Sequence, residues 1–256
     1  MDKTHLRWFN YWLKSQNNGV PSDPPVKIFE PGKNAWLSTD HWPLSNGESS
    51  FFLRFNGTEG SLSTELPLTE DPTQSYRYNP VDPAPTQVNI KKYPVEDIPL
   101  DQTPVESRPD VILYTSEPLT KEAVISGWPY LKIFASSNCE DTEWHVKITD
   151  VYPDGRSIKV TQGCLRASYR DSLETPSPLI PDHIYAFNIE LWPTHHVFLP
   201  DHRLRITVTS SDFPWFARSM NCFGKIATLA APNIAINTVF HAPVYPSCLK
   251  LPVNRA

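Results

Sequence analysis

The first fifteen residues have the apolar pattern of a helix. Leu6, Phe9 and Leu13, together with Trp8 and Trp12, recur at the three- and four-residue spacing of one helix face. An Asn-Asn-Gly sequence then provides a C-terminal stop. The pattern predicts a short helix that is too apolar to stand alone in water. Such a helix either docks on the rest of its own chain or packs against a neighbouring domain.

From residue 26 onward the apolar positions change to short runs and to alternation with period two. Segments 26–29 and 51–55 are bounded by Pro-Gly and Asn-Gly turn sequences. Residues 67–109 contain many prolines and little periodicity, which predicts a long extended connection. Nine further strands are expected, at 111–114, 130–135, 144–149, 157–160, 165–169, 184–191, 204–209, 239–240 and 249–253. Because no long helix separates them, the pattern predicts an all-β antiparallel sandwich, most simply a jelly roll.

One hairpin is marked especially clearly within this series. Two strand-like runs flank Asp154-Gly155, a dipeptide that suits a tight turn in which both central residues have positive φ. Asp154 and Gly155 are therefore predicted to have a structural role in the turn.

Composition and charge exclude several classes of function. The 256 residues include 27 Pro and 9 Gly, and the formal net charge is -5 with a pI of about 5.9. A net negative charge does not provide the basic surface that binds nucleic acid. No run of 18 apolar residues is present, so no membrane span is expected. The N-terminus has no signal-peptide pattern, and we expect a cytoplasmic location.

Residues that could bind a metal ion are better explained by structural roles. Four cysteines are widely spaced without a C-x-x-C pair, which predicts reduced thiols, although one or two disulfides are permitted: Cys139, Cys164, Cys222 and Cys248. Three histidines are expected in a surface loop, where adjacent side chains point apart: His195, His196 and His202. Four carboxylates lack the spacing of a calcium loop: Asp141, Glu143, Asp150 and Asp154. We expect neither a metal nor a cofactor.

Tryptophan residues leave a carbohydrate-binding module open as an alternative. Jelly rolls often bind sugars, and exposed indole rings can stack on a sugar ring. The candidates are Trp36, Trp42, Trp128 and Trp215. They are scattered along the chain, and tryptophan in a β-rich chain is more often part of the core.

Several segments, in one order, resemble a known family. They are HLRWFNYWLK, AWLSTDHWP, DVILYTSEPLT, DTEWHVKITDVYPDGRSIKV, IYAFNIELWPTHHVFLPDHRLRITVTSSDFPWFAR and PSCLKLPV. Together they resemble the C-terminal β-domain of serine hydrolases that include X-Pro dipeptidyl peptidase, cocaine esterase and the α-amino acid ester hydrolases. The resemblance implies a galactose-binding-like jelly roll over 26–256. Residues 1–25 would then be the last helix and linker of an α/β-hydrolase domain.

The resemblance also implies which parts of the enzyme to expect elsewhere. In this family the nucleophilic Ser and the triad Asp and His precede the helix that begins here at His5. This chain contains no G-x-S-x-G sequence. We therefore expect no catalytic residue here, an α/β-hydrolase catalytic domain as partner, and a role in stabilising the enzyme and shaping its pocket. Homo-oligomers are possible in such an arrangement.

In this family a loop after a D-P-x-P-T element approaches the substrate pocket. The matching element is Asp82 to Thr86, so the resemblance assigns a pocket-facing role to Gln87, Val88, Asn89 and Ile90. Relatives often have two glycines soon after this threonine, and this chain has none. A plain extended connection is the alternative.

Overall fold

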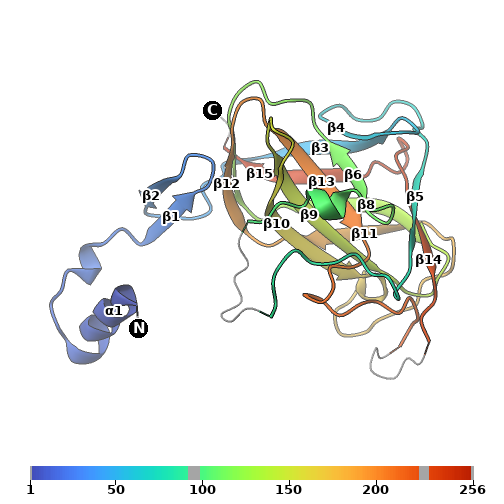
Figure 1. Ribbon diagram of the computed structural model, residues 1–256. Coiled ribbons are helices and arrows are strands. Elements are labelled where there is room, and N and C mark those ends of the chain that lie inside the picture. Colours follow the sequence, from blue (N-terminus) through green and yellow to red (C-terminus); the bar gives the residue numbers. More distant parts are fainter. Residues whose placement is uncertain (1, 92–98, 225–230, 255–256) are drawn as a thin grey trace.

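The computed structural model describes residues 2–91, 99–224 and 231–254, and Figure 1 shows a β-sandwich from which an N-terminal arm projects. The helical elements are α1 (Lys3–Lys14), η1 (Val20–Ser22), α2 (Thr103–Glu106) and η2 (Ala167–Tyr169). The strands are β1 (Val26–Glu30), β2 (Ala35–Thr39), β3 (Gly47–Phe55), β4 (Gly60–Ser63), β5 (Gln74–Tyr78), β6 (Ile112–Thr115), β7 (Ala123–Gly127), β8 (Tyr130–Ser137), β9 (Glu143–Val151), β10 (Ser157–Arg166), β11 (Tyr185–Glu190), β12 (Thr194–Phe198), β13 (Arg203–Thr209), β14 (Ala235–Val239) and β15 (Cys248–Val253). We use "arm" for residues 3–39, which comprise α1, η1, β1 and β2.

The sandwich has two antiparallel layers. One contains β10, β9, β13 and β6 in that order. The other contains β4, β3, β15, β8 and β11, and β14 and β5 extend it from one edge of β8. Strands β7 and β12 pair with each other, and β7 also pairs with β15 of this second layer. A single parallel pairing between Ser61 and Thr115 links the layers. The predicted all-β sandwich is confirmed.

The core lies between the two layers because alternate side chains of each strand point inward. On β9 these are Trp144, Val146 and Ile148, all fully buried. The ring of Trp144 packs against Phe187 of the other layer, with centroids 5.3 Å apart. The opposite face of β9 is also buried, which the alternating sequence does not predict. It lies under the segment that precedes β6.

Strand positions differ from the predictions in several places. Residues 157–160 and 165–169 were expected as two strands, but β10 runs unbroken to Arg166 with an irregularity after Lys159, and η2 follows. The predicted connection 67–109 contains β5 and α2. Strands β4, β7 and β12 were not predicted, and β14 runs from Ala235 to Val239 where a strand was expected at 239–240.

The loop between β9 and β10 contains Asp154 and Gly155. Its turn is closed by the Gly155 amide, which donates to the Tyr152 carbonyl at 2.9 Å. Gly155 has φ +92°, whereas Asp154 is not among the residues with positive φ. The expectation of two positive φ angles is therefore wrong. Pro153 and Asp154 form the centre of a type I-like turn, and Gly155 follows as the left-handed residue of a three-residue hairpin loop.

Candidate functional site

Helix α1 presents apolar side chains to solvent on a surface that its own chain does not cover. None of its twelve residues is buried, and Leu13 is 75% exposed. Arg7 forms an ion pair with Asp23, and its guanidinium also donates to the Asn18 carbonyl. These contacts hold the helix only to the segment that follows it. Docking of the helix on its own β-domain, one of the two sequence-based alternatives, is therefore not what the structure shows.

The hairpin β1–β2 has apolar side chains on both of its faces. Ile28 lies opposite Leu37 on one face, and Phe29 lies opposite Trp36 on the other, with ring centroids 5.4 Å apart. No residue of the two strands is buried. A sheet that is apolar on both faces is typical of strands covered on both sides. An isolated two-stranded hairpin is only marginally stable in water. The hairpin thus has the pattern of strands that belong inside a larger assembly.

The tip of this hairpin attaches the arm to the sandwich. The Val197 amide of β12 donates to the Pro31 carbonyl at 3.1 Å. A Cβ at Gly32 would lie 2.1 Å from the Val197 carbonyl oxygen, so only glycine permits this approach. Two side-chain contacts flank it: a hydrogen bond between His195 and Glu30 at 3.1 Å, and an ion pair between Lys33 and Glu122 at 2.9 Å.

A strap, residues 82–91 and 99–110, contains the loop to which the sequence assigned a pocket role. Its first end is fixed by Phe213, whose amide donates to the Ala84 carbonyl and whose carbonyl accepts from the Thr86 amide. Of the assigned residues, Val88 is buried, Gln87 is half-buried, and Asn89 and Ile90 are exposed. Part of the loop therefore faces outward beside a fixed anchor. The structure does not bring it together with any catalytic group.

The second end of the strap is fixed by buried charges on the outer face of β9, where the short green helix α2 lies in front of the sheet in Figure 1. Lys147 Nζ donates to Asp212 Oδ1 at 2.8 Å and to Gln102 Oε1 at 3.0 Å. Glu106 accepts from Arg205 and from the Ser157 hydroxyl, both at 2.6 Å. Buried ion pairs with additional hydrogen bonds fix geometry strongly, because removing one partner leaves an uncompensated charge. Sequence reasoning missed this polar face.

The three histidines are not in a surface loop as expected. His195 and His196 are in β12, His202 precedes β13, and all three are buried. His196 Nε2 and His202 Nδ1 lie 3.0 and 2.8 Å from the two oxygens of Asp150. The surface-loop expectation failed because carboxylates from distant strands partner these rings inside the protein. Within the described residues, no group of three potential ligands is arranged to hold a metal ion.

The remaining carboxylates considered for calcium also have protein partners. Asp141 accepts from Arg166 and from the Ser168 amide, and burial raises its pKa above the ordinary value against the opposing effect of Arg166. Glu143 pairs with His145, and Asp154 pairs with Arg156. Each of these three carboxylates thus has a partner within the protein.

The four cysteines are free thiols. Cys139 and Cys248 are buried, whereas Cys164 is exposed. Burial of its sulfur atom raises the pKa of Cys139 to about 11, so this thiol stays protonated at neutral pH.

The tryptophans of the carbohydrate-binding alternative are in three separate places. Trp36 is on the arm, Trp215 is half-buried after Phe213, and Trp42 contacts Trp128. The rings of Trp42 and Trp128 are 4.8 Å apart and inclined by 59°. Inclined rings do not make the flat surface on which a sugar stacks.

Comparisons with known proteins identify the family. Residues 18–250 match the family described as the X-Pro dipeptidyl-peptidase C-terminal non-catalytic domain. The chain is 33% identical to the cocaine esterase of Rhodococcus sp. (strain MB1 Bresler), over 97% of this chain and 45% of that protein. This chain belongs to that family. It therefore has the fold and position of a non-catalytic C-terminal domain of such hydrolases.

Solved structures agree with this assignment. An aminopeptidase from a marine sediment archaeon, Thaumarchaeota archaeon, is 28% identical, with a TM-score of 0.85 over 99% of this chain and 44% of that one. An α-amino acid ester hydrolase is 30% identical, with a TM-score of 0.81 over 97% of this chain and 44% of that one. The chain thus spans less than half the length of these relatives. No helix of the described residues is long and apolar enough to cross a membrane.

Proposed function

We propose that this chain is the accessory part of a serine hydrolase of the esterase, acylase or X-Pro dipeptidyl-peptidase type. It stabilises an α/β-hydrolase catalytic domain and shapes its substrate pocket, and it has no catalytic residue of its own. The main support is the arm, in which the apolar side chains of α1 and the Phe29–Trp36 face of β1–β2 are exposed to solvent. The matched relatives are longer, as this role requires.

The part of the chain that we propose contacts the catalytic domain includes the hairpin β1–β2 as well as α1. The sequence placed a boundary between residues 25 and 26, but β1 and β2 form a sheet of their own, separate from the sandwich. The outer edges of this two-stranded sheet are available for pairing with another sheet. In this proposal α1 and β1–β2 pack together on the catalytic domain, and the hairpin tip connects that domain to β12.

The pocket-shaping role is assigned to the strap. The exposed Asn89 and Ile90 follow shortly after Thr86, whose amide donates to the Phe213 carbonyl. A loop anchored on a rigid layer is suited to contacting a substrate bound in a neighbouring domain. A cytoplasmic location belongs to the same proposal, supported by the four free thiols.

The test compares the chain alone, the catalytic part of the same hydrolase alone, and the two joined. The chain alone is expected to show no turnover of p-nitrophenyl esters or X-Pro p-nitroanilides and no labelling by a fluorophosphonate probe. The joined protein is expected to keep its activity longer on heating than the catalytic part alone. Replacing Ile90 by Ala is expected to change KM or kcat of the joined protein without changing its thermal half-life.

Two outcomes contradict the proposal. One is stoichiometric labelling of a serine in the isolated chain, with turnover lost when that serine is replaced. The other is equal heat resistance of the catalytic part with and without this chain. The carbohydrate-binding alternative is checked separately by titrating sugars against Trp fluorescence, with Trp128→Ala as the matched variant.

A further inference from the structure

Three aromatic side chains lie together on the outer face of the layer that contains β9 and β10. Trp192 is 46% exposed, Phe213 is 38% exposed and Phe216 is half-buried. The ring centroids of Trp192 and Phe216 are 6.4 Å apart, and Phe216 packs on His145 of β9 at 5.2 Å. We call Trp192, Phe213 and Phe216 the aromatic patch. Neighbouring exposed aromatic side chains mark an interaction surface, whereas single ones are common on any protein.

The layer beneath the aromatic patch holds it in place. The Trp192 amide donates to the Gln162 carbonyl of β10 at 2.8 Å. Phe213 follows Asp212, whose carboxylate accepts from the buried Lys147 ammonium at 2.8 Å. A surface that is fixed before binding loses little conformational entropy in a complex, and large aromatic side chains often dominate the binding energy. The aromatic patch is therefore suited to a stable contact.

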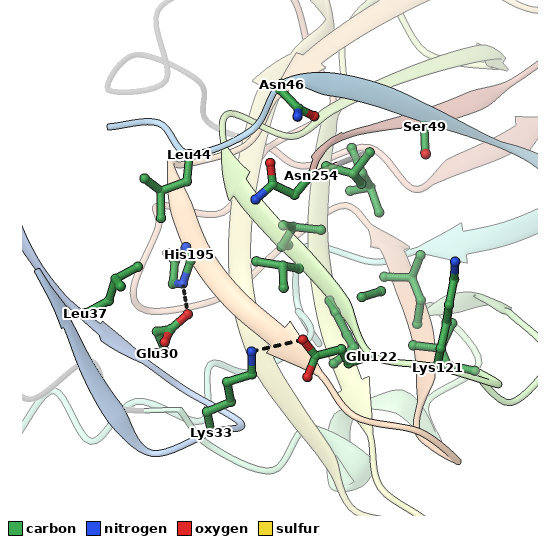
Figure 2. A pocket seen from close by; sticks show the side chains of 18 of the residues that line it. Glu30, Lys33, Leu37, Leu44, Asn46, Ser49, Lys121, Glu122, His195 and Asn254 are labelled. Carbon is green, nitrogen blue, oxygen red and sulfur yellow. Dashed lines mark hydrogen bonds and ion pairs between the residues drawn. The ribbon is translucent and has the colours of Figure 1, made fainter. Parts of the chain in front are cut away.

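The aromatic patch connects the base of the arm to the strap. Trp192 is two residues before β12, the strand that receives the hairpin, and Figure 2 shows His195 of β12 beside Glu30 of the hairpin. Phe213 holds the start of the strap, because its carbonyl accepts from the Thr86 amide. In Figure 1 the arm projects from the side of the sandwich on which β12 lies. A partner that covers the arm and extends past β12 would meet Trp192 first.

We propose that the aromatic patch is a second docking surface for the α/β-hydrolase catalytic domain, in addition to the arm. The inference rests on the proposed function, which supplies this partner. The matched relatives are more than twice as long as this chain, so a partner of sufficient size is present in them. Domains that share only a small contact move relative to each other. Contacts on both the arm and the sandwich fix the orientation of the catalytic domain.

Cys164 provides a direct readout of this contact. It is exposed and lies opposite His145 in the β9–β10 register, so its side chain is on the same face as the aromatic patch. The background carries Cys222→Ser, and the remaining two cysteines are buried. We expect N-ethylmaleimide at pH 8.5 to modify Cys164 at least tenfold more slowly in the joined hydrolase than in the chain alone. Mass spectrometry of the peptide that contains Cys164 measures both rates.

Matched variants separate docking from folding of the sandwich. Trp192→Ala should speed modification of Cys164 in the joined hydrolase and shorten the thermal half-life of its activity by at least about threefold, as for loss of a side chain important for binding. Trp192→Phe should preserve both, and Trp192→Ala should leave the urea midpoint of the chain alone unchanged. Ile236→Ala removes a side chain that is 41% exposed on β14, across the sandwich from the arm in Figure 1, and should change neither readout.

The inference is overturned if Cys164 reacts equally fast in the chain alone and in the joined hydrolase, or if Trp192→Ala acts no more strongly than Ile236→Ala. Protection of Cys164 in the chain alone that increases with its concentration would also overturn it, because a second copy would then cover the aromatic patch. Trp12→Ser in the arm distinguishes this failure from failure of the proposed function. A shorter half-life with Trp12→Ser but not with Trp192→Ala keeps the arm as docking surface and removes the aromatic patch, whereas no effect of either variant contradicts both proposals.

Discussion

The arm and the sandwich contain similar aromatic residues but place them in opposite environments. Trp144 in the sandwich is fully buried, whereas Trp12 in the arm is 59% exposed. The sandwich covers its apolar residues because two layers face each other. The arm has one short helix and one two-stranded sheet, which cannot enclose a core. The difference indicates that the sandwich is stable through its own contacts, whereas the arm needs a second surface.

The same contrast holds for ion pairs. Lys147 and Asp212 in the sandwich are both buried, and Lys147 donates a further hydrogen bond to Gln102. Arg7 and Asp23 in the arm are both exposed. Burial makes a broken pair costly, whereas solvent compensates for a broken exposed pair. Variants in matched positions of the two regions therefore test how independent the sandwich is.

The largest difference is expected between two tryptophan truncations. Trp144→Ala should lower the free energy of unfolding by about 3–5 kcal/mol, because it opens a cavity between the layers. Trp12→Ala should change it by less than about 0.5 kcal/mol, because the side chain is already in water. Urea melts of both variants measure this. Equal losses would mean that the arm and the sandwich unfold as one unit and would contradict the comparison.

Breaking the buried ion pair is expected to have a similar or slightly smaller effect. Asp212→Ala leaves the Lys147 ammonium buried without its carboxylate, which should cost about 3–5 kcal/mol. Asp23→Ala in the arm should leave the midpoint of the urea melt unchanged. Restoring a partner by combining Asp212→Ala with Lys147→Met should recover part of the loss. If Asp212→Ala alone kept wild-type stability, the buried pair would contribute nothing and this part of the comparison would fail.

Much of the fold could be predicted from the sequence, because most core strands alternate apolar and polar residues. Strands β8, β9, β13 and β15 were expected at nearly their observed places. Strand β12 was not, because Thr-His-His at its start has no strand-like alternation. Its histidines are buried against Glu30 and Asp150, which are distant in the sequence. Contacts of this kind depend on tertiary structure and leave no local signal.

The candidate sites could be predicted only in part. The apolar helix and its need for a partner followed from residue spacing alone. The first strand of the hairpin was expected, yet the apolar residues on both faces of the hairpin were informative only once the register was known: Ile28 lies opposite Leu37 on one face, and Phe29 lies opposite Trp36 on the other. The aromatic patch was missed because its rings come from two separate segments, which meet only in the fold. No local pattern in the sequence marks such a place.

A smaller effect is expected at the β9–β10 turn, which belongs entirely to the sandwich. Gly155→Val should lower the free energy of unfolding by about 1–3 kcal/mol, because a β-branched residue is strained at φ +92° even though no atom crowds that position. Asp154→Asn should leave the midpoint unchanged, since either side chain can accept from the Arg156 amide. Equal midpoints of the two variants in urea would show that the turn does not require a glycine.

The smallest effect is expected in the pH dependence of the free energy of unfolding. The comparison is between one histidine of the sandwich and one histidine of the arm. His241 Nδ1 donates to the Pro72 carbonyl at 2.9 Å, and its Nε2 lies 2.8 Å from the Tyr114 hydroxyl. Burial lowers the pKa of His241 below its ordinary value, against the opposing effects of the Pro72 carbonyl and the Asp71 carboxylate. The folded protein therefore keeps this ring neutral at a pH at which the unfolded chain has begun to protonate it.

Because the unfolded chain binds the proton more readily, the free energy of unfolding should fall as the pH drops below about 6.5, by at most about 1.4 kcal/mol per unit from this group. His241→Gln should remove this part of the slope between pH 7.5 and 5.5, whatever its effect on stability at pH 7.5. His5→Gln in the exposed α1 should leave the slope as it is. Urea midpoints at four pH values measure both. If His5→Gln flattened the slope as much as His241→Gln, the arm would be coupled to folding of the sandwich, and the contrast between the two regions would fail.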